Sequence, residues 1–250
     1  MFVLRRQRQT YHKLITRINM LMVLSQAETF VSVSRLYMPY GRFICLALVL
    51  TISAVHLFVP KKKEFTKALL LPMLLLYYLA SSHAPSWVVI AALIFSWLGD
   101  VLLIPNGTKW FVAGGIAFML SHISFIGAYT GDIVFGRKVV LPAVLLYVVY
   151  LAAAALVIGR IKPCTGKLTP ALYLYLSVNA LMNAFAFMRL LSHPGLPAAL
   201  TYAGAVLFFI SDSTLFIGCF CEKKKHDTFL PVMATYILGE LLITQGLIAA

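Results

Sequence analysis

Residues 95–104 read Phe-Ser-Trp-Leu-Gly-Asp-Val-Leu-Leu-Ile, so Asp100 stands as a single carboxylate in an otherwise apolar stretch. Residues 208–217 read Phe-Phe-Ile-Ser-Asp-Ser-Thr-Leu-Phe-Ile and contain Asp212. Both stretches have the same order of residues: a small residue, the aspartate, two further residues and a leucine. A carboxylate at the centre of a bilayer costs roughly 2.5–3.5 kcal/mol and is seldom kept without a partner or a task. The two stretches therefore predict two membrane spans whose acids share one site.

The composition of the whole chain agrees with a membrane protein. Of the 250 residues, 61% are hydrophobic and only 12% are charged, which exceeds the apolar content of a soluble domain. The net charge of +13 is concentrated in the N-terminal region and in short connections, where it suits membrane orientation and anionic headgroups better than nucleic acid. The four cysteines form neither a metal-binding spacing nor an evident disulfide framework.

Eight apolar segments are close to the length of about 20 residues that crosses a bilayer. They cover approximately residues 40–59, 66–81, 86–104, 110–128, 139–158, 168–188, 198–219 and 228–249. The sequence thus predicts an all-α fold, a polytopic integral membrane helical bundle of about eight transmembrane helices in residues 40–250. Residues 1–39 are expected to form a basic, partly amphipathic N-terminal tail.

The basic residues of the connections predict the orientation. Eleven follow spans one, three, five and seven, and three follow spans two, four and six, so the first set is expected to face the cytoplasm. Spans three and seven, which carry Asp100 and Asp212, would then run in parallel, which is consistent with a 4+4 repeat. In parallel spans both carboxylates would lie roughly 6–10 Å below the same surface.

Other polar side chains stand within the predicted spans. Asn179 and Asn183 share one helix face because they are four residues apart, and the same holds for Tyr236 and Glu240. Together with His122 they predict a polar interior near the two aspartates. The structural alternative is that each merely hydrogen-bonds a neighbouring helix.

Several of these motifs resemble one known family. They are Lys67 with Pro72, residues 95–100, Gly114-Gly115 with Phe118, Ser121-His122, Gly204-Ala205 with Phe208, Ser211-Asp212, and Tyr236 with residues 241–243. Over residues 40–249 the chain resembles the YhhN-type lysoplasmalogenases, the transmembrane protein 86 family. Members are integral membrane hydrolases that cleave the vinyl ether of lysoplasmalogens into a fatty aldehyde and a glycerophospho-alcohol. The chain departs from the expected pattern at Phe125 and at Glu240.

The resemblance implies that Asp100 and Asp212 are the catalytic residues of a hydrolase domain. Cleavage of a vinyl ether needs an acid for the β-carbon and a base that orients water, roles that two carboxylates can divide. Which aspartate is the acid stays open. We expect His122, Ser211, Asn179, Asn183, Tyr236 and Glu240 to support the pair and Lys67 to bind the substrate phosphate. No metal and no organic cofactor is expected.

The expected partners are membrane lipids and a lysophospholipid substrate with an ethanolamine or choline headgroup. The expected location is the endoplasmic reticulum or another cellular membrane if the source is eukaryotic. Buried acids also suit a membrane transporter, an intramembrane aspartyl protease, or a metal hydrolase that uses His122 with both aspartates. The oligomeric state stays open.

Overall fold

The structure is a computed structural model, and it describes residues 40–59, 63–220 and 228–249. Within these ranges the regular structure is helical and contains no strand, so the predicted all-α fold is confirmed. The N-terminal tail and the basic residues of two connections lie outside the described residues. They are residues 1–39, Lys61, Lys62 and Lys223–Lys225.

Each of the eight apolar segments predicted from the sequence coincides with one α-helix of the described chain, to within a few residues at most ends. The helices are α2 (Gly41–Phe58), α3 (Lys63–Ser81), α4 (Trp87–Leu102), α5 (Thr108–Thr130), α6 (Arg137–Thr165), α7 (Thr169–Ser192), α8 (Leu196–Phe220) and α9 (Phe229–Ile248). A 3₁₀ turn, η2 (Gly166–Leu168), joins α6 to α7. The largest difference is at the end of α6, which extends seven residues beyond the predicted segment.

The described helices include 6 candidate membrane spans by length and composition. One of these, Arg137–Ser192, runs through α6, η2 and α7, while α4 has 16 residues and is shorter than a typical span. The protein is therefore an integral, multi-pass membrane protein. The count of about eight spans stays a prediction.

The chain divides after Ile44 into two units. Of the first unit the structure describes only residues 40–44, and residues 41–44 are the first residues of α2. The second unit, residues 45–250, contains every residue of the candidate site described below.

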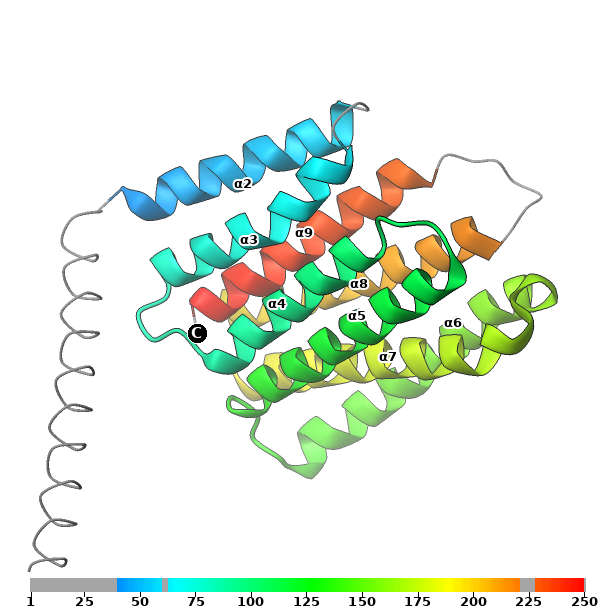
Figure 1. The fold of residues 1–250 in the computed structure, drawn as a ribbon. Coiled ribbons are helices and arrows are strands. Elements are labelled where there is room, and N and C mark those ends of the chain that lie inside the picture. Colours follow the sequence, from blue (N-terminus) through cyan, green and yellow to red (C-terminus); the bar gives the residue numbers. More distant parts are fainter. Residues whose placement is uncertain (1–39, 60–62, 221–227, 250) are drawn as a thin grey trace, which may run out of the picture. The chain divides into compact units, whose positions relative to one another are not determined.

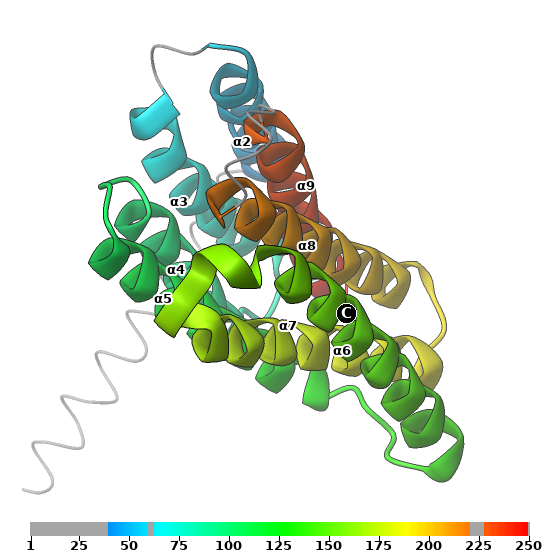
Figure 2. The same cartoon turned by 90° about the vertical axis from the view of Figure 1, so that its right-hand side faces the viewer.

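Six helices of the second unit close into a ring. In the order α3, α4, α5, α7, α8 and α9, each helix packs against the next, and α9 packs back against α3. Helix α6 lies outside this ring against α7 and α8 (Figures 1 and 2). Helices α4 and α8 run in the same direction (Figure 1), so their C-terminal halves, which contain the two aspartates, lie toward the same side of the ring.

The contact between α8 and α9 depends on two glycines. A Cβ atom added to Gly204 would lie 2.6 Å from the backbone oxygen of Gly239, and one added to Gly239 would lie 3.0 Å from the oxygen of Gly204. The backbones approach this closely because neither residue has a side chain, as is common where membrane helices associate.

We expect Gly204→Ala to destabilise the protein by about 1–3 kcal/mol, because the added methyl overpacks the contact between α8 and α9. The matched control is Gly159→Ala in α6, where a Cβ meets nothing within 4 Å. Alanine there is expected to be neutral or to stabilise the helix by up to about 1 kcal/mol. Thermal unfolding in detergent measures both variants, and equal stability of the two would contradict this account of the α8–α9 contact.

Candidate functional site

Every helix of the ring contributes a polar side chain to its interior. They are Lys67 of α3, Asp100 of α4, His122 of α5, Asn179 of α7, Asp212 of α8, and Tyr236 and Glu240 of α9. All except Lys67 are buried, with Asp100 at 2% and Asp212 at 5% exposure. Polar groups removed from solvent in this way must find partners inside the protein or hold water.

Asp212 is held by two donors from α7. The Tyr175 hydroxyl donates to Asp212 Oδ2 at 2.8 Å, and Asn179 Nδ2 donates to the same oxygen at 2.7 Å. Tyr175 and Asn179 lie four residues apart on one face of α7, so a single helix face presents both donors. His122 Nε2 lies 3.8 Å from Asp212 Oδ2, close to the carboxyl group but without a hydrogen bond.

Asp100 has different partners. The Tyr236 hydroxyl of α9 donates to Asp100 Oδ2 at 2.8 Å, and Lys67 Nζ of α3 lies 3.6 Å from Asp100 Oδ1. The Lys67 side chain is 19% exposed, so its ammonium group lies between the interior and the surface. Of the two aspartates, Asp100 is therefore the one with a cationic partner among the described residues.

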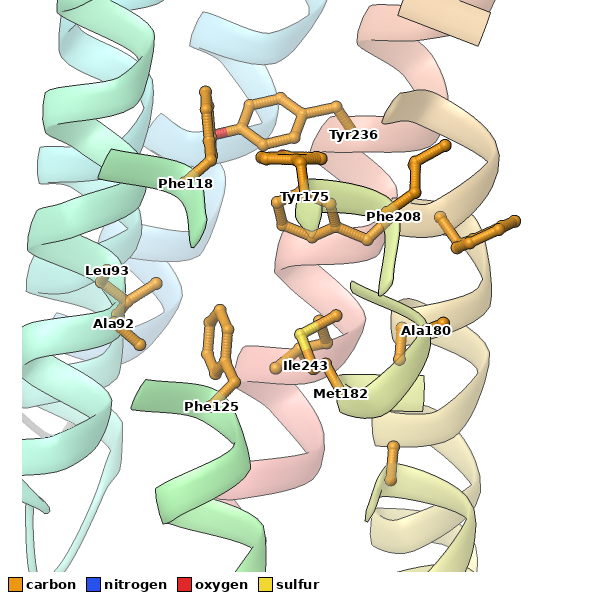
Figure 3. Packing of buried hydrophobic residues seen from close by; sticks show 14 of the residues in the cluster. Ala92, Leu93, Phe118, Phe125, Tyr175, Ala180, Met182, Phe208, Tyr236 and Ile243 are labelled. Carbon is orange, nitrogen blue, oxygen red and sulfur yellow. The ribbon is translucent and has the colours of Figure 1, made fainter. Parts of the chain in front are cut away.

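Aromatic rings pack against one another among the residues that surround the two carboxyl groups. The Tyr236 ring packs edge-on against Phe118 and Phe208, with ring centroids 5.8 and 5.4 Å apart, and the His122 ring packs against Phe208 at 4.8 Å. Figure 3 shows Phe118, Tyr175, Phe208 and Tyr236 gathered at one level, above Phe125 and Ile243. Asp100 and Asp212 lie close enough to interact electrostatically.

Glu240 is a third carboxyl group beside this pair. It is fully buried one turn after Tyr236 and interacts electrostatically with both Asp100 and Asp212. The Ser96 hydroxyl is close enough to interact with Glu240, but among the described residues no hydrogen bond of ordinary geometry reaches either Glu240 oxygen or either ring nitrogen of His122. Such atoms in a polar interior are typical binding positions for water.

Most of the predicted site residues lie together in the structure, and two of them, Asn183 and Ser211, hydrogen-bond to residues other than the aspartates. Asn183 donates to Asn179 Oδ1 at 3.1 Å and so positions the amide that holds Asp212. Ser211 donates to the Val232 carbonyl at 3.0 Å, so its hydroxyl joins α8 to α9.

Sequence reasoning missed Tyr175, which stands four residues before Asn179 on the same helix face. That spacing was the signal that could have found it. Among residues 40–59, 63–220 and 228–249, no group of three or more His, Cys, Asp and Glu side chains is arranged to hold a metal ion.

Comparison with known proteins decides the family. The profile of the YhhN family matches residues 62–247, which contain both aspartates and every partner described above. The chain belongs to the YhhN family. No solved structure matches it.

Three proteins from different organisms are similar to this YhhN protein. The human protein named lysoplasmalogenase TMEM86A is 27% identical over 166 residues, which cover 65% of each chain. A lysoplasmalogenase of Mycobacterium bovis is 34% identical over 166 residues, 64% of this chain and 59% of the relative. An uncharacterized membrane protein YhhN of Escherichia coli is 28% identical over 180 residues, 72% of this chain and 83% of the relative. The match thus covers 65% of the human lysoplasmalogenase and 59% of the mycobacterial one, in each case less than two thirds of the relative's own length.

We expect Lys67→Met to lower the thermal stability of the protein when residue 100 is Asp, because the buried carboxylate then loses its counter-charge. The same substitution in an Asp100→Asn background should have little effect, since an amide needs no counter-charge. Contacting charged residues typically couple by about 0.5–3 kcal/mol in such a cycle.

Lys109→Met is the matched control for this cycle, because Lys109 is an exposed lysine in the first turn of α5. It should leave stability unchanged in both backgrounds. An equal loss from Lys67→Met with Asp or Asn at residue 100 would show that Lys67 and Asp100 are not paired.

Proposed function

We propose that this protein is a membrane-embedded lysoplasmalogenase, which hydrolyses the vinyl ether bond of alkenyl lysophospholipids to a fatty aldehyde and a glycerophospho-alcohol. The observation that carries the proposal is the pair of buried carboxyl groups, Asp100 and Asp212, each held by its own donors in one site. The names of the human and mycobacterial relatives support it.

The surroundings of the two carboxyl groups suggest how they divide the chemistry. The ammonium group of Lys67 stabilises the ionised form of Asp100. Asp212 has neutral donors on one oxygen, Oδ2, and like charges at close range oppose ionisation of both groups. We therefore assign the general acid to Asp212 and the general base to Asp100.

In the first step Asp212 gives its proton to the β-carbon of the vinyl ether, which leaves an oxocarbenium ion on the α-carbon. Water then adds to the α-carbon while Asp100 takes its proton, and the product is a hemiacetal. In the last step the hemiacetal hydroxyl returns a proton to Asp212 and Asp100 protonates the departing glycerol oxygen. The aldehyde forms, and both carboxyl groups return to their starting state.

The proposed substrate also fits the charge at the edge of the site. Lys67 is partly exposed, and lysine binds phosphate as a point charge, so the ammonium group can contact the headgroup while it remains beside Asp100. A headgroup in this position would leave the vinyl ether, the first group of the chain, next to the carboxyl pair.

An acyl lysophospholipid would place an ester at the same position. Ester cleavage usually needs an activated nucleophile and an oxyanion hole. The interior hydroxyls of Ser96 and Ser121 hydrogen-bond to each other at 2.7 Å, and neither ring nitrogen of His122 takes part in a hydrogen bond with the described residues. This arrangement favours the vinyl ether over the ester.

We further propose that all eight helices cross the membrane and form a hydrolase domain from residue 40 onwards. Helices α6 and α7 have 29 and 24 residues, enough for one crossing each. The parallel course of α4 and α8, each with its aspartate, supports the 4+4 repeat (Figure 1).

We expect purified protein in detergent to release free fatty aldehyde from an alkenyl lysophosphatidylethanolamine and to release little fatty acid from the acyl analogue. Asp100→Asn and Asp212→Asn should each lower this turnover by about 10²- to 10⁴-fold, because each removes a general acid or base. Aldehyde and fatty acid are measured in parallel on the same samples.

Glu64→Gln is the matched control, since it makes the same kind of change at an exposed carboxylate near the start of α3. It should keep normal turnover. Fatty acid from the acyl lipid without aldehyde from the alkenyl lipid would refute the proposal, and no product from either lipid would favour a transporter.

A further inference from the structure

An apolar cavity lies beside the carboxyl pair, between the first half of α5, the start of α7 and the end of α8. Its volume is about 170 Å³, and its walls include Phe111, Gly115, Phe118, Leu172, Tyr175 and Phe216. No charged side chain lines it, and the Tyr175 hydroxyl already donates to Asp212. The cavity therefore suits a hydrocarbon group.

The inner end of the cavity reaches the reacting groups. Tyr175 forms part of its wall and donates to Asp212 at 2.8 Å. Phe118 forms another part of the wall and packs against the ring of Tyr236, which holds Asp100. Figure 3 shows Phe118, Tyr175 and Tyr236 together at this level. A chain in the cavity would thus begin at the carboxyl pair.

The outer end of the cavity reaches the surface of the helix ring. Ile116 of α5 and Leu174 of α7 line the cavity and are 50% and 57% exposed, whereas Phe118 and Tyr175 are 6% and 7% exposed. The lining therefore passes from the interior to the apolar outer faces of α5 and α7. In a membrane those faces meet lipid chains.

We propose that this cavity binds the first part of the alkenyl chain of the substrate, with the remainder passing between α5 and α7 into the bilayer. The inference rests on the proposed function. An engineered cavity of about 150 Å³ lined by Leu, Ile and Phe takes up benzene, so this volume is enough for a short segment of chain.

This placement agrees with the division of roles between the aspartates. The headgroup lies toward Lys67 and Asp100, and the chain lies toward Tyr175 and Asp212. In a vinyl ether the α-carbon is on the headgroup side and the β-carbon is on the chain side. The carbon that receives the proton would therefore meet Asp212, and the carbon that receives water would meet Asp100.

Gly115 offers a way to fill the cavity without disturbing the helices. It lines the cavity, and a Cβ added to it meets nothing within 4 Å. A Cβ added to Gly159 of α6 also meets nothing within 4 Å, and Gly159 does not line the cavity. Gly115→Leu and Gly159→Leu thus make the same change in helical glycines, inside and outside the proposed chain site.

The test measures kcat/KM for alkenyl lysolipids of increasing chain length with the unchanged protein and both variants. For the unchanged protein, kcat/KM should rise by about fourfold per methylene until the cavity is filled. For Gly115→Leu, kcat/KM should stop rising at a shorter chain length. On long chains its kcat/KM should be about tenfold or more below that of the unchanged protein, because KM rises while kcat stays the same. Gly159→Leu should follow the unchanged protein, and equal thermal stability of the two variants confirms that both fold.

A binding measurement separates failure of the chain site from failure of the proposed function. A saturated ether lysolipid with a diazirine in the first part of its chain should label peptides from residues 108–119 and 168–175, and Gly115→Leu should abolish this labelling. Such labelling without aldehyde from any chain length would uphold the chain site and refute the enzyme. Aldehyde release with labelling elsewhere, or a chain-length profile that Gly115→Leu leaves unchanged, would refute the chain site.

Discussion

The structure depends on the cost of holding two carboxyl groups in an apolar interior. Asp100 and Asp212 lie in helices with no hydrogen-bonding partner for them in the same helix, so their partners come from elsewhere. Tyr236 and Lys67 come from α9 and α3, and Tyr175 comes from α7. An unsatisfied buried polar group costs several kcal/mol in the absence of water, so the ring of helices and the site form together.

In the same arrangement the surroundings of Asp100 and Asp212 differ in charge and polarity. Lys67 lies beside Asp100, whereas Tyr175, which donates to Asp212, lines an apolar cavity. A molecule with a charged end and a hydrocarbon end can therefore bind in one orientation. The Phe118 and Phe208 rings pack against each other, with centroids 6.2 Å apart, and both pack against the ring of Tyr236. The lysophospholipid that we propose as the substrate has both a charged end and a hydrocarbon end.

The helices could be predicted from sequence because apolar segments of membrane length are a strong local signal. The residues that bear the site were also visible, since Asp100, Asp212 and Glu240 are conspicuous in apolar runs. Their partners were harder to predict. Tyr175 resembles any other aromatic residue in a span, and its spacing of four from Asn179 shows only that the two share a helix face. The packing of α7 against α8 directs that face toward Asp212.

Other features depend on tertiary structure alone. Ser211 adjoins Asp212 in sequence but points its hydroxyl at the backbone of α9, because neighbouring residues on a helix face different directions. Phosphate binding by Lys67 stays a prediction, and its position beside Asp100, with Nζ 3.6 Å from Oδ1, was not predicted from the sequence. The ring order of the helices and the cavity between α5, α7 and α8 carry no sequence signal.

In the proposed mechanism the carboxyl pair protonates the β-carbon of the vinyl ether and directs water to the α-carbon. The most direct test is to run the reaction in D₂O enriched in oxygen-18 and analyse both products by mass spectrometry and NMR. We expect an aldehyde with one deuterium, in a single configuration, on the carbon next to the carbonyl, and a glycerophospho-alcohol without oxygen-18. Oxygen-18 in the glycerophospho-alcohol, or deuterium in both configurations, would contradict it.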